Sequence, residues 1–322
     1  MKAIVYDRYG SPDVLRMEEV PTPSPENGEV LIRIHATTVS SGDWRLRSLD
    51  MPAGFGLIAR PVFGLSGPRQ RILGSEFSGT VASVGAGVSR FRAGDAVFGF
   101  AGVKLGCHAE YRCMPENGGL ALKPGNLEFD EAAALCFGGT TALDFFQRAK
   151  LRAGEKVLVN GASGAVGTAA VQLARHAGAE VTGVCSATNA ELVRSLGATH
   201  AIDYAREDFT RNGETYDVIL DAAGTAPYSR SRVALKDGGR LLLVLAGLGG
   251  LLAAPWVSMT TRHRVIAGPA AERPADVQAL ADLAAAGAFK PVIDRRYTFD
   301  QFADAHRRVD SGRKRGNVVV ML

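Results

Sequence analysis

The chain has 322 residues, of which 46% are hydrophobic and 22% are charged, with 38 Gly and 14 Pro. This mixture excludes a disordered chain, a collagen and a coiled coil, and the length predicts two domains. The 37 Lys and Arg residues exceed the 33 Asp and Glu residues by only four. So mild an excess argues against a general polyanion or nucleic-acid binder.

The cysteines and the long apolar stretch indicate where the protein works. Four cysteines are too few and too scattered for a disulfide framework, which predicts free thiols and a cytoplasmic location. Residues 241–261 carry no charge and are long enough to cross a bilayer. However, Gly247 and Pro255 interrupt them, so we expect a buried strand, a loop and an apolar helix, with no integral membrane span.

The first third of the chain has the pattern of β structure. Residues 29–35 alternate, with Val30, Ile32 and Ile34 on one face, as in a half-buried strand. On the opposite face, His35 is expected at the surface. Turn signals follow at short intervals, which predicts a small barrel or sandwich. Residues 51–71 are expected to be irregular.

From about Ala153 the pattern changes to alternating strands and helices, which predicts a doubly wound parallel sheet. The helices are expected at 166–177 and 190–196, and the strands at 156–160, 181–185, 200–202, 217–220 and 241–245. The last sixty residues are mixed. A helix is expected at 275–286, and another after a capping box of Thr298 and Gln301, followed by a strand at 318–320.

The strongest local signal is the turn at residues 160–167, between a predicted strand and a predicted helix. Against the dinucleotide fingerprint, Ala162 takes the first glycine position, and Gly164 and Gly167 take the other two. Gly164 lets the backbone approach a pyrophosphate, and the helix N-terminus favours its negative charge. The second strand ends without the acid that usually binds the ribose 2′-hydroxyl of NAD. Ser186 and Asn189 stand there instead, which favours NADPH, although the neighbouring Arg or Lys expected at an NADPH site is missing.

An ordered series of short motifs makes the chain similar to a known family over nearly its whole length. The series runs from residues 1–5 and 28–32 through 74–81, 94–97 and 109–111 to 161–167, 196–198, 221–224 and 315–319. It resembles the medium-chain dehydrogenase/reductase superfamily, in its zinc-independent quinone oxidoreductase and enone reductase branch. The resemblance implies an α/β protein with two domains. They are a GroES-like β-rich catalytic domain at 1–123, completed by 266–322, and a Rossmann domain at 124–265.

The resemblance also bears on metal binding. Zinc members of the family have a Cys near the Ser40 position and a His at the Ser75 position, and neither ligand is present here. The family's cluster of four structural cysteines is also absent. Cys107 and His108 are neighbours, and on a strand their side chains would point to opposite faces. We therefore expect no metal, because catalytic zinc needs about three such ligands.

Without a Lewis acid, oxidation of simple alcohols is improbable. The resemblance implies an NADPH-dependent reductase of quinones or α,β-unsaturated carbonyls, working as a homodimer. Ser40, Asp43 and Trp44 are candidates for the substrate pocket, although Asp43 and Trp44 could equally be a helix start with an aromatic core residue. The positions that the resemblance assigns to the cofactor, together with Ser186 and Asn189, are Thr141, Ser163, Gly164, Ala165, Val166, Tyr204, Ala223, Leu245, Arg315 and Asn317.

A different class of function also stays open. The family often has Asn at the Ser40 position, and its loss would suit an NADPH-binding sensor or structural protein with little turnover.

Overall fold

The computed structural model describes residues 1–322, with the exception of the Leu57 side chain, and divides into two units. One unit comprises residues 1–51, 56–137 and 272–322, and the other comprises residues 52–55 and 138–271. The resemblance implied boundaries at 123/124 and 265/266, whereas the units change at 137/138 and 271/272. The first lies later because α3 (Phe129–Ala133) packs on β3, β4 and β15 of the β-rich unit. The second lies later because β13 (Arg264–Ala267) belongs to the parallel sheet.

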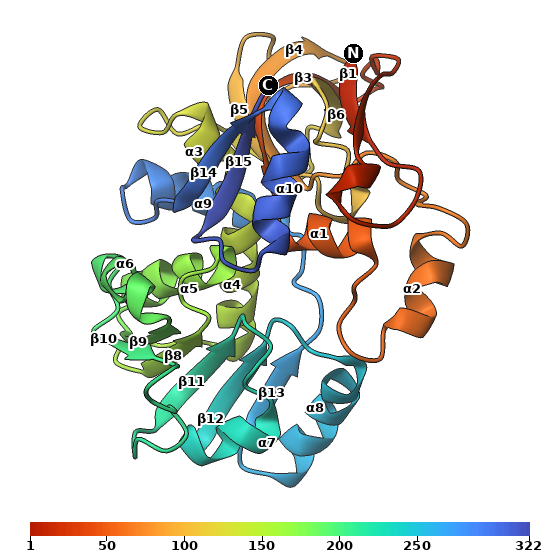
Figure 1. The fold of residues 1–322 in the computed structure, drawn as a ribbon. Coiled ribbons are helices and arrows are strands. Elements are labelled where there is room, and N and C mark those ends of the chain that lie inside the picture. The colour runs from red at the N-terminus through yellow and green to blue at the C-terminus, as the bar shows by residue number, and fades with distance from the viewer. The chain divides into compact units, whose positions relative to one another are not determined.

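The β-rich unit is built on a seven-stranded sheet (Figure 1). Its strand order is β14-β15-β3-β4-β5-β7, with β6 also paired to β3, and β1 and β2 form a separate ribbon. The elements of this unit are β1 (Lys2–Val5), β2 (Arg16–Glu19), β3 (Glu29–Val39), α1 (Ser41–Ser48), α2 (Gly56–Phe63), β4 (Glu76–Val84), β5 (Ala96–Phe100), β6 (Tyr111–Pro115), β7 (Leu120–Leu122), α3, α9 (Pro274–Ala285), β14 (Ile293–Thr298), α10 (Phe302–Asp310) and β15 (Asn317–Met321).

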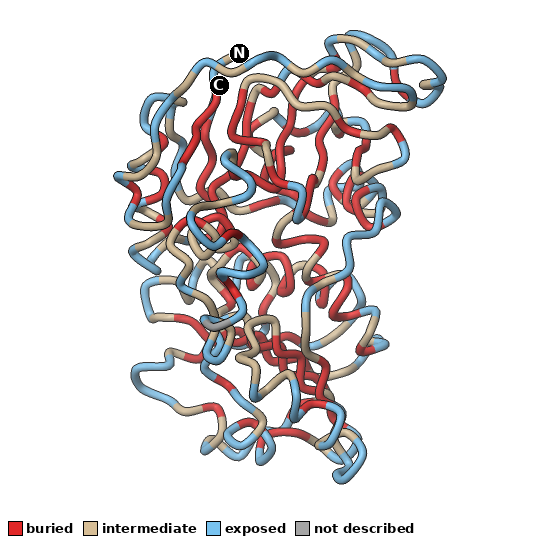
Figure 2. The backbone as a smooth tube through the Cα atoms, turned by 90° about the vertical axis from the view of Figure 1, so that its right-hand side faces the viewer, coloured by how far each residue is buried: buried red, intermediate tan, exposed pale blue. Residues whose placement is uncertain are grey.

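Strand β3 is the central strand of this sheet and runs four residues beyond the strand expected from alternation. Val30, Ile32 and Ile34 are buried on one face, as expected. From Ala36 to Val39 every residue is buried, because α3 covers one face at Ala36 and the core around α10 covers the other at Val39. A strand buried on both faces has no period of two, so the pattern does not mark its end. Figure 2 colours the backbone by burial, and the buried stretches lie inside each unit while many of the outer loops are exposed.

The second unit has a six-stranded parallel sheet in the order β10-β9-β8-β11-β12-β13 (Figure 1). The chain enters at β8, winds out through β9 and β10, and returns to continue from β11, which is the doubly wound order. Its elements are α4 (Cys136–Ala149), β8 (Lys156–Asn160), α5 (Ala165–His176), β9 (Glu180–Cys185), α6 (Ala190–Ser195), β10 (His200–Asp203), β11 (Tyr216–Asp221), α7 (Tyr228–Ser231), β12 (Leu235–Leu243), α8 (Leu248–Thr260) and β13.

Two segments differ from their sequence expectation. Strand β12 begins at Leu235 and includes Gly238, with φ +77°, whereas the strand was expected to begin at Leu241, after the glycine pair at 238–239. A register shift against β11 absorbs the extra residues, so the turn signal marks a bulge inside a strand. Residues 51–71 contain α2, although Pro61 inside it gave a helix-breaking signal.

The uncharged stretch at 241–261 folds as expected. It comprises the end of β12, a loop and helix α8. Among the described residues no helix has the length and apolar character needed to cross a bilayer.

Candidate active site

The glycine-rich turn after β8 has the geometry that close approach of a phosphate requires. Gly161 has φ +82°, and a Cβ at Gly167 would lie 2.1 Å from the Gly161 carbonyl oxygen. Only glycine therefore fits at Gly167. A Cβ at Gly164 would have a single neighbour within 4 Å, so the backbone at the start of α5 borders open space. An N-terminus open in this way fits the pyrophosphate of a dinucleotide.

A polar pair marks the point where the order of the parallel sheet reverses. Asn160 ends β8 and Asp221 ends the neighbouring β11, and the Asn160 Nδ2 donates to Asp221 Oδ1 at 2.8 Å. The buried Asp221 carboxylate also accepts from the backbone N–H groups of Gly224 at 2.9 Å and Ala226 at 2.8 Å. One carboxylate thus shapes the loop after β11. Ligands of open α/β sheets bind at this switch point.

Several predicted cofactor residues meet at the same edge of the sheet. The Asn189 amide donates to Ser163 Oγ at 3.1 Å, which joins the loop after β9 to the glycine-rich turn. A Cβ at Gly161 would lie 3.1 Å from that of Ala223. A Cβ at Gly224, the next residue, would lie 3.3 Å from the Leu245 Cβ. The ends of β8, β11 and β12 are therefore contiguous here.

The loops after β9 and β10 form the part of this edge where the adenosine side is expected. Ser186 is half-buried, with its hydroxyl 3.0 Å from that of Thr188. Tyr204 follows β10 and is 66% exposed. An acid is also nearby, because Asp203 pairs in register with Cys185. Its carboxylate is turned to its own loop, where it accepts from Ala205 N at 3.2 Å.

In the β-rich unit, the Asp43 carboxylate organises the candidate substrate residues. It accepts from the backbone N–H and the hydroxyl of Ser40, at 2.8 and 2.6 Å, and Ser40 caps α1. Its other oxygen accepts from Gly74 N at 2.8 Å. Asp43 is 1% exposed, so these bonds form in a low dielectric, where they are strong. Ser40 and the segment beginning at Gly74 are thereby held together.

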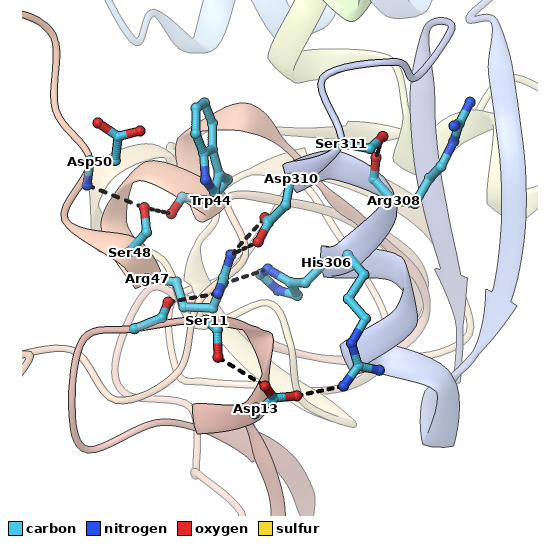
Figure 3. A network of polar contacts seen from close by, with 12 residues as sticks. Ser11, Asp13, Trp44, Arg47, Ser48, Asp50, His306, Arg308, Asp310 and Ser311 are labelled. Carbon is cyan, nitrogen blue, oxygen red and sulfur yellow. Dashed lines mark hydrogen bonds and ion pairs between the residues drawn. The ribbon is translucent and has the colours of Figure 1, made fainter.

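Helix α1 is anchored to α10 by a buried arginine. Figure 3 shows the Arg47 guanidinium between Asp310 and the His306 ring. Both carboxylate oxygens of Asp310 accept from Arg47 Nη2 at 2.6 Å, and the His306 Nδ1 accepts from Nε at 3.3 Å. Trp44 packs against the same helix, beside Phe302. Asp43 and Trp44 therefore form the helix start and the aromatic core contact that the sequence left open.

The Ser75 and Glu76 pair follows Gly74 in a fully buried setting. The Glu76 carboxylate accepts from Thr38 Oγ1 at 2.5 Å and from Phe137 N at 2.6 Å, so within the β-rich unit it joins β3 and β4 to Phe137. Burial raises the pKa of the Glu76 carboxyl to about 7, and the Asp43 charge adds to the increase. The buried Ser75 hydroxyl has no hydrogen-bond partner among the described residues.

The remaining predicted residues have diverse surroundings. Thr141 lies on α4 in the parallel-sheet unit, and Ala165 and Val166 begin α5. Asn317, in the β-rich unit, is buried, and its amide donates to the Val292 carbonyl oxygen at 3.1 Å. The side chain of Arg315 is 55% exposed.

Two interpretations of histidines were wrong. His35 is half-buried, hydrogen-bonded to Thr80 at 2.9 Å and packed on the Phe129 ring, because α3 covers that face of β3. Cys107 and His108 lie outside any strand, so strand alternation does not separate them. Both are fully buried, and His108 Nε2 lies 2.9 Å from the Thr38 carbonyl oxygen.

Sequence reasoning missed the roles of Asp221 and Glu76. In the sequence each is one residue within a short family motif, at 221–224 and 74–81. For Asp221 a signal was available, because it ends a buried strand at the sheet edge that carries the glycine-rich turn. For Glu76 the signal was weaker, since an acid within an apolar strand indicates a buried partner but does not identify it.

Two family models match the chain. One, described as an alcohol dehydrogenase GroES-like domain, matches residues 26–124, and one described as a zinc-binding dehydrogenase matches residues 196–320. A quinone oxidoreductase of Rattus norvegicus is 32% identical, with 100% of this chain and 98% of the relative covered. The chain belongs to the medium-chain dehydrogenase/reductase superfamily, in its quinone oxidoreductase branch.

Two further comparisons agree with this membership. A chloroplastic NADPH-dependent alkenal/one oxidoreductase of Arabidopsis thaliana is 31% identical, with 99% of this chain and 79% of the relative covered. The solved quinone oxidoreductase of Coxiella burnetii superposes with a TM-score of 0.88 at 28% identity, with 100% of this chain and 99% of that chain covered. This medium-chain reductase is therefore an oxidoreductase, and its fold implies a nicotinamide cofactor.

Replacement of Glu76 by Gln is expected to flatten the pH dependence of stability. Because the pKa is about 7 in the folded chain and 4.5 ordinarily, the folded chain holds this proton more tightly. The contribution of Glu76 to the unfolding free energy is therefore greatest below pH 4.5 and is lost as the pH rises through 7. Between pH 5 and 8 this contribution to the unfolding free energy falls by about 2 kcal/mol.

Denaturant unfolding at both pH values measures this effect in the wild type and in the Glu76→Gln variant. Glu191→Gln, at an exposed position on α6, is the matched control and should keep the wild-type pH dependence. The interpretation fails if Glu76→Gln loses as much stability between pH 5 and 8 as the wild type does.

Proposed function

We propose that the protein is an NADPH-dependent, zinc-independent reductase of quinones or α,β-unsaturated carbonyls. The observation that carries the proposal is the pair of serines at the metal-ligand positions of the resembled family. The Ser40 hydroxyl donates a hydrogen bond to the Asp43 carboxylate, and its oxygen accepts one from Asp43 N and so caps α1. Two relatives of the chain are named as a quinone oxidoreductase and an NADPH-dependent alkenal/one oxidoreductase.

The donor set in this region does not suit a catalytic zinc ion. Such a site needs about three Cys, His or carboxylate ligands with an open position. The Asp43 oxygens are occupied by backbone and hydroxyl donors, and those of Glu76 by Thr38 and Phe137. No three His, Cys, Asp or Glu side chains converge on a metal position among the described residues.

The chain's own residues would bind and orient the reactants. When bound, a reduced nicotinamide supplies the hydride, so the acceptor must be a carbon or quinone that takes a hydride readily. The open backbone at Gly164 and the positive end of α5 would fix the diphosphate. Ser40 is engaged with Asp43, so we assign it no role in proton donation.

The acceptor class is tested by following NADPH oxidation against a panel of quinones and short enones, with a chelator present throughout. Turnover of one class that is indifferent to the chelator is the expected result. Loss of turnover on chelation, restored by zinc, would contradict the proposal. NADPH binding without oxidation by any acceptor would favour the alternative of a sensor or structural protein. The observation that supports this alternative is that the Ser40 hydroxyl already donates its hydrogen bond to Asp43.

The preference for NADPH rests on the loop after β9. Ser186 and Asn189 place uncharged polar groups there, and Asp203 is directed to its own turn. A 2′-phosphate would therefore meet hydroxyl and amide groups without a facing carboxylate. The relative from Arabidopsis thaliana is named as NADPH-dependent.

Replacing Ser186 by Asp should reverse this preference. A carboxylate at this position repels a 2′-phosphate and accepts a hydrogen bond from a 2′-hydroxyl. We expect the Kd for NADPH to rise roughly tenfold, which is about 1.4 kcal/mol, while that for NADH stays the same or falls. Titration by nicotinamide fluorescence measures both. Ser195→Asp, at the exposed end of α6, is the control. Equal effects on both dinucleotides would refute the assignment.

We also propose a homodimer formed through the parallel-sheet unit. Strand β13 is an edge strand, and the neighbouring helix α8 exposes three large apolar side chains. These are Leu252, Trp256 and Met259, which are 67–76% exposed. Contiguous exposed apolar side chains of this size mark an interaction surface. Unpaired backbone groups on an edge strand favour pairing with a second copy.

Trp256→Glu should convert the dimer to a monomer. The charge would be buried without a partner in the interface, which strongly opposes association. Light scattering coupled to gel filtration should give twice the 33.9 kDa chain mass for the wild type and the mass of one chain for the variant. Val103→Glu, at an exposed position in the other unit, should remain dimeric. A monomeric wild type would disprove the dimer.

A further inference from the structure

A cavity of about 470 Å³ lies in the β-rich unit, away from every residue assigned above to cofactor or acceptor. Its walls come from β1, the segment after β2, residues 69–72 and β6. All of these belong to one unit, so the cavity is defined without reference to the other. Its volume is in the range of small-molecule sites.

Arg112 on β6 is the unusual group in this wall. Its Nε is buried without a hydrogen-bond partner, and no ion pair of its side chain is found among the described residues. A half-buried guanidinium with no counter-ion is rare, because an unpaired buried charge is costly. The Nη atoms of the same guanidinium make no hydrogen bond or ion pair among the described residues, and they are the groups that a ligand in the cavity would meet.

Gly106 provides the room that the guanidinium occupies. It has φ +91°, and a Cβ there would lie 2.5 Å from Arg112 Nη1. The guanidinium therefore packs directly on the Gly106 backbone. This contact limits the positions open to the Arg112 head group at the cavity wall.

The other charges around the cavity do not neutralise Arg112. Arg71 is paired with Asp7 and Glu18, which are also shared by Arg16. Arg69 donates to the Pro61 carbonyl oxygen and has no ion pair among the described residues. No Asp or Glu is among the described residues that line the cavity. Its electrostatic potential is therefore positive and favours an anion.

The remaining wall is mostly apolar, and its other polar side chains are Gln70, Tyr111 and Cys113. Val5, Val20, Pro21 and Ile72 line it together with Met1. A bare inorganic anion would leave this surface unused, whereas a hydrocarbon chain would bury it at roughly 25 cal/mol per Å². A carboxylate also matches the planar geometry of a guanidinium.

We propose that this cavity binds a small amphipathic monocarboxylate, with its carboxylate on Arg112 and its hydrocarbon part against Val5, Val20 and Ile72. The ligand class is an aliphatic or aromatic acid with a single negative charge. The site is separate from the oxidoreductase chemistry and does not depend on the proposed acceptor or cofactor preference.

Calorimetric titration of the full chain with octanoate tests the proposal. We expect one octanoate per chain, with the Kd raised at least tenfold by Arg112→Gln and also raised by Gln70→Glu. The second variant places a negative charge at the cavity without touching Arg112, so it keeps the test decisive if Arg112→Gln fails to fold. Arg92→Gln is the control, since that side chain is 89% exposed and lies outside the cavity.

Three results would overturn the proposal. The first is the absence of octanoate binding to the wild type, or octanoate binding that neither variant weakens. The second is inorganic phosphate binding as tightly as octanoate, which would mean that the apolar wall plays no part. The third is octylammonium binding as tightly as octanoate, which would mean that the charge of Arg112 plays no part.

Discussion

The Asp43 carboxylate is the contact on which the arrangement of the β-rich unit's site depends. It closes the capping box of α1 with Ser40 and holds the Gly74 backbone with its other oxygen. Two segments far apart in the sequence are thus joined through one buried group. Removing the carboxylate would leave the backbone N–H groups of Ser40 and Gly74 without partners in a buried setting, where each lost bond costs about 1–3 kcal/mol.

The parallel-sheet unit uses the same physical device. There the carboxylate is that of Asp221, which holds the loop after β11 by its backbone N–H groups and is itself held by Asn160. In both units a buried acid takes its hydrogen bonds from backbone donors at the end of a strand. Such bonds are charge-assisted and fix the backbone itself. Because the backbone is fixed in this way, small residues such as Gly164 and Ala223 can border the site without side-chain contacts to hold them.

The parts of the fold that could be predicted are those with a local physical signal. The alternating strands and helices of the second unit gave the doubly wound sheet, because each element repeats its own period. The glycine-rich turn also gave a local signal, since Gly167 is required by contact with Gly161. The predictions failed at positions whose structure depends on an element far away in the sequence. The end of β3 depends on α3 and α10, and the environment of His35 depends on Phe129.

The same distinction applies to the site. Ser40 and Asp43 are close in sequence, so their role as a helix start could be weighed from spacing alone. The hydrogen bond from Gly74 N to the Asp43 carboxylate joins residues 31 positions apart, and no local pattern predicts it. The Thr38 and Phe137 partners of Glu76 are equally remote. Hydrogen bonds of this kind are decided by topology, which one sequence gives only through a resemblance.

The engagement of Ser40 shows how this part of the β-rich unit is held in place. Its hydroxyl donates a hydrogen bond to the buried Asp43 carboxylate and accepts one from Asp43 N, so the side chain stabilises the backbone at the start of α1. Glu76 is likewise enclosed by Thr38 and Phe137, so its high pKa reflects burial within the frame of the site. These polar groups hold one another in place. In the proposed function the reactive atoms therefore come from the bound molecules, and selectivity follows from how an acceptor is oriented, which is the form of catalysis that proximity and alignment provide.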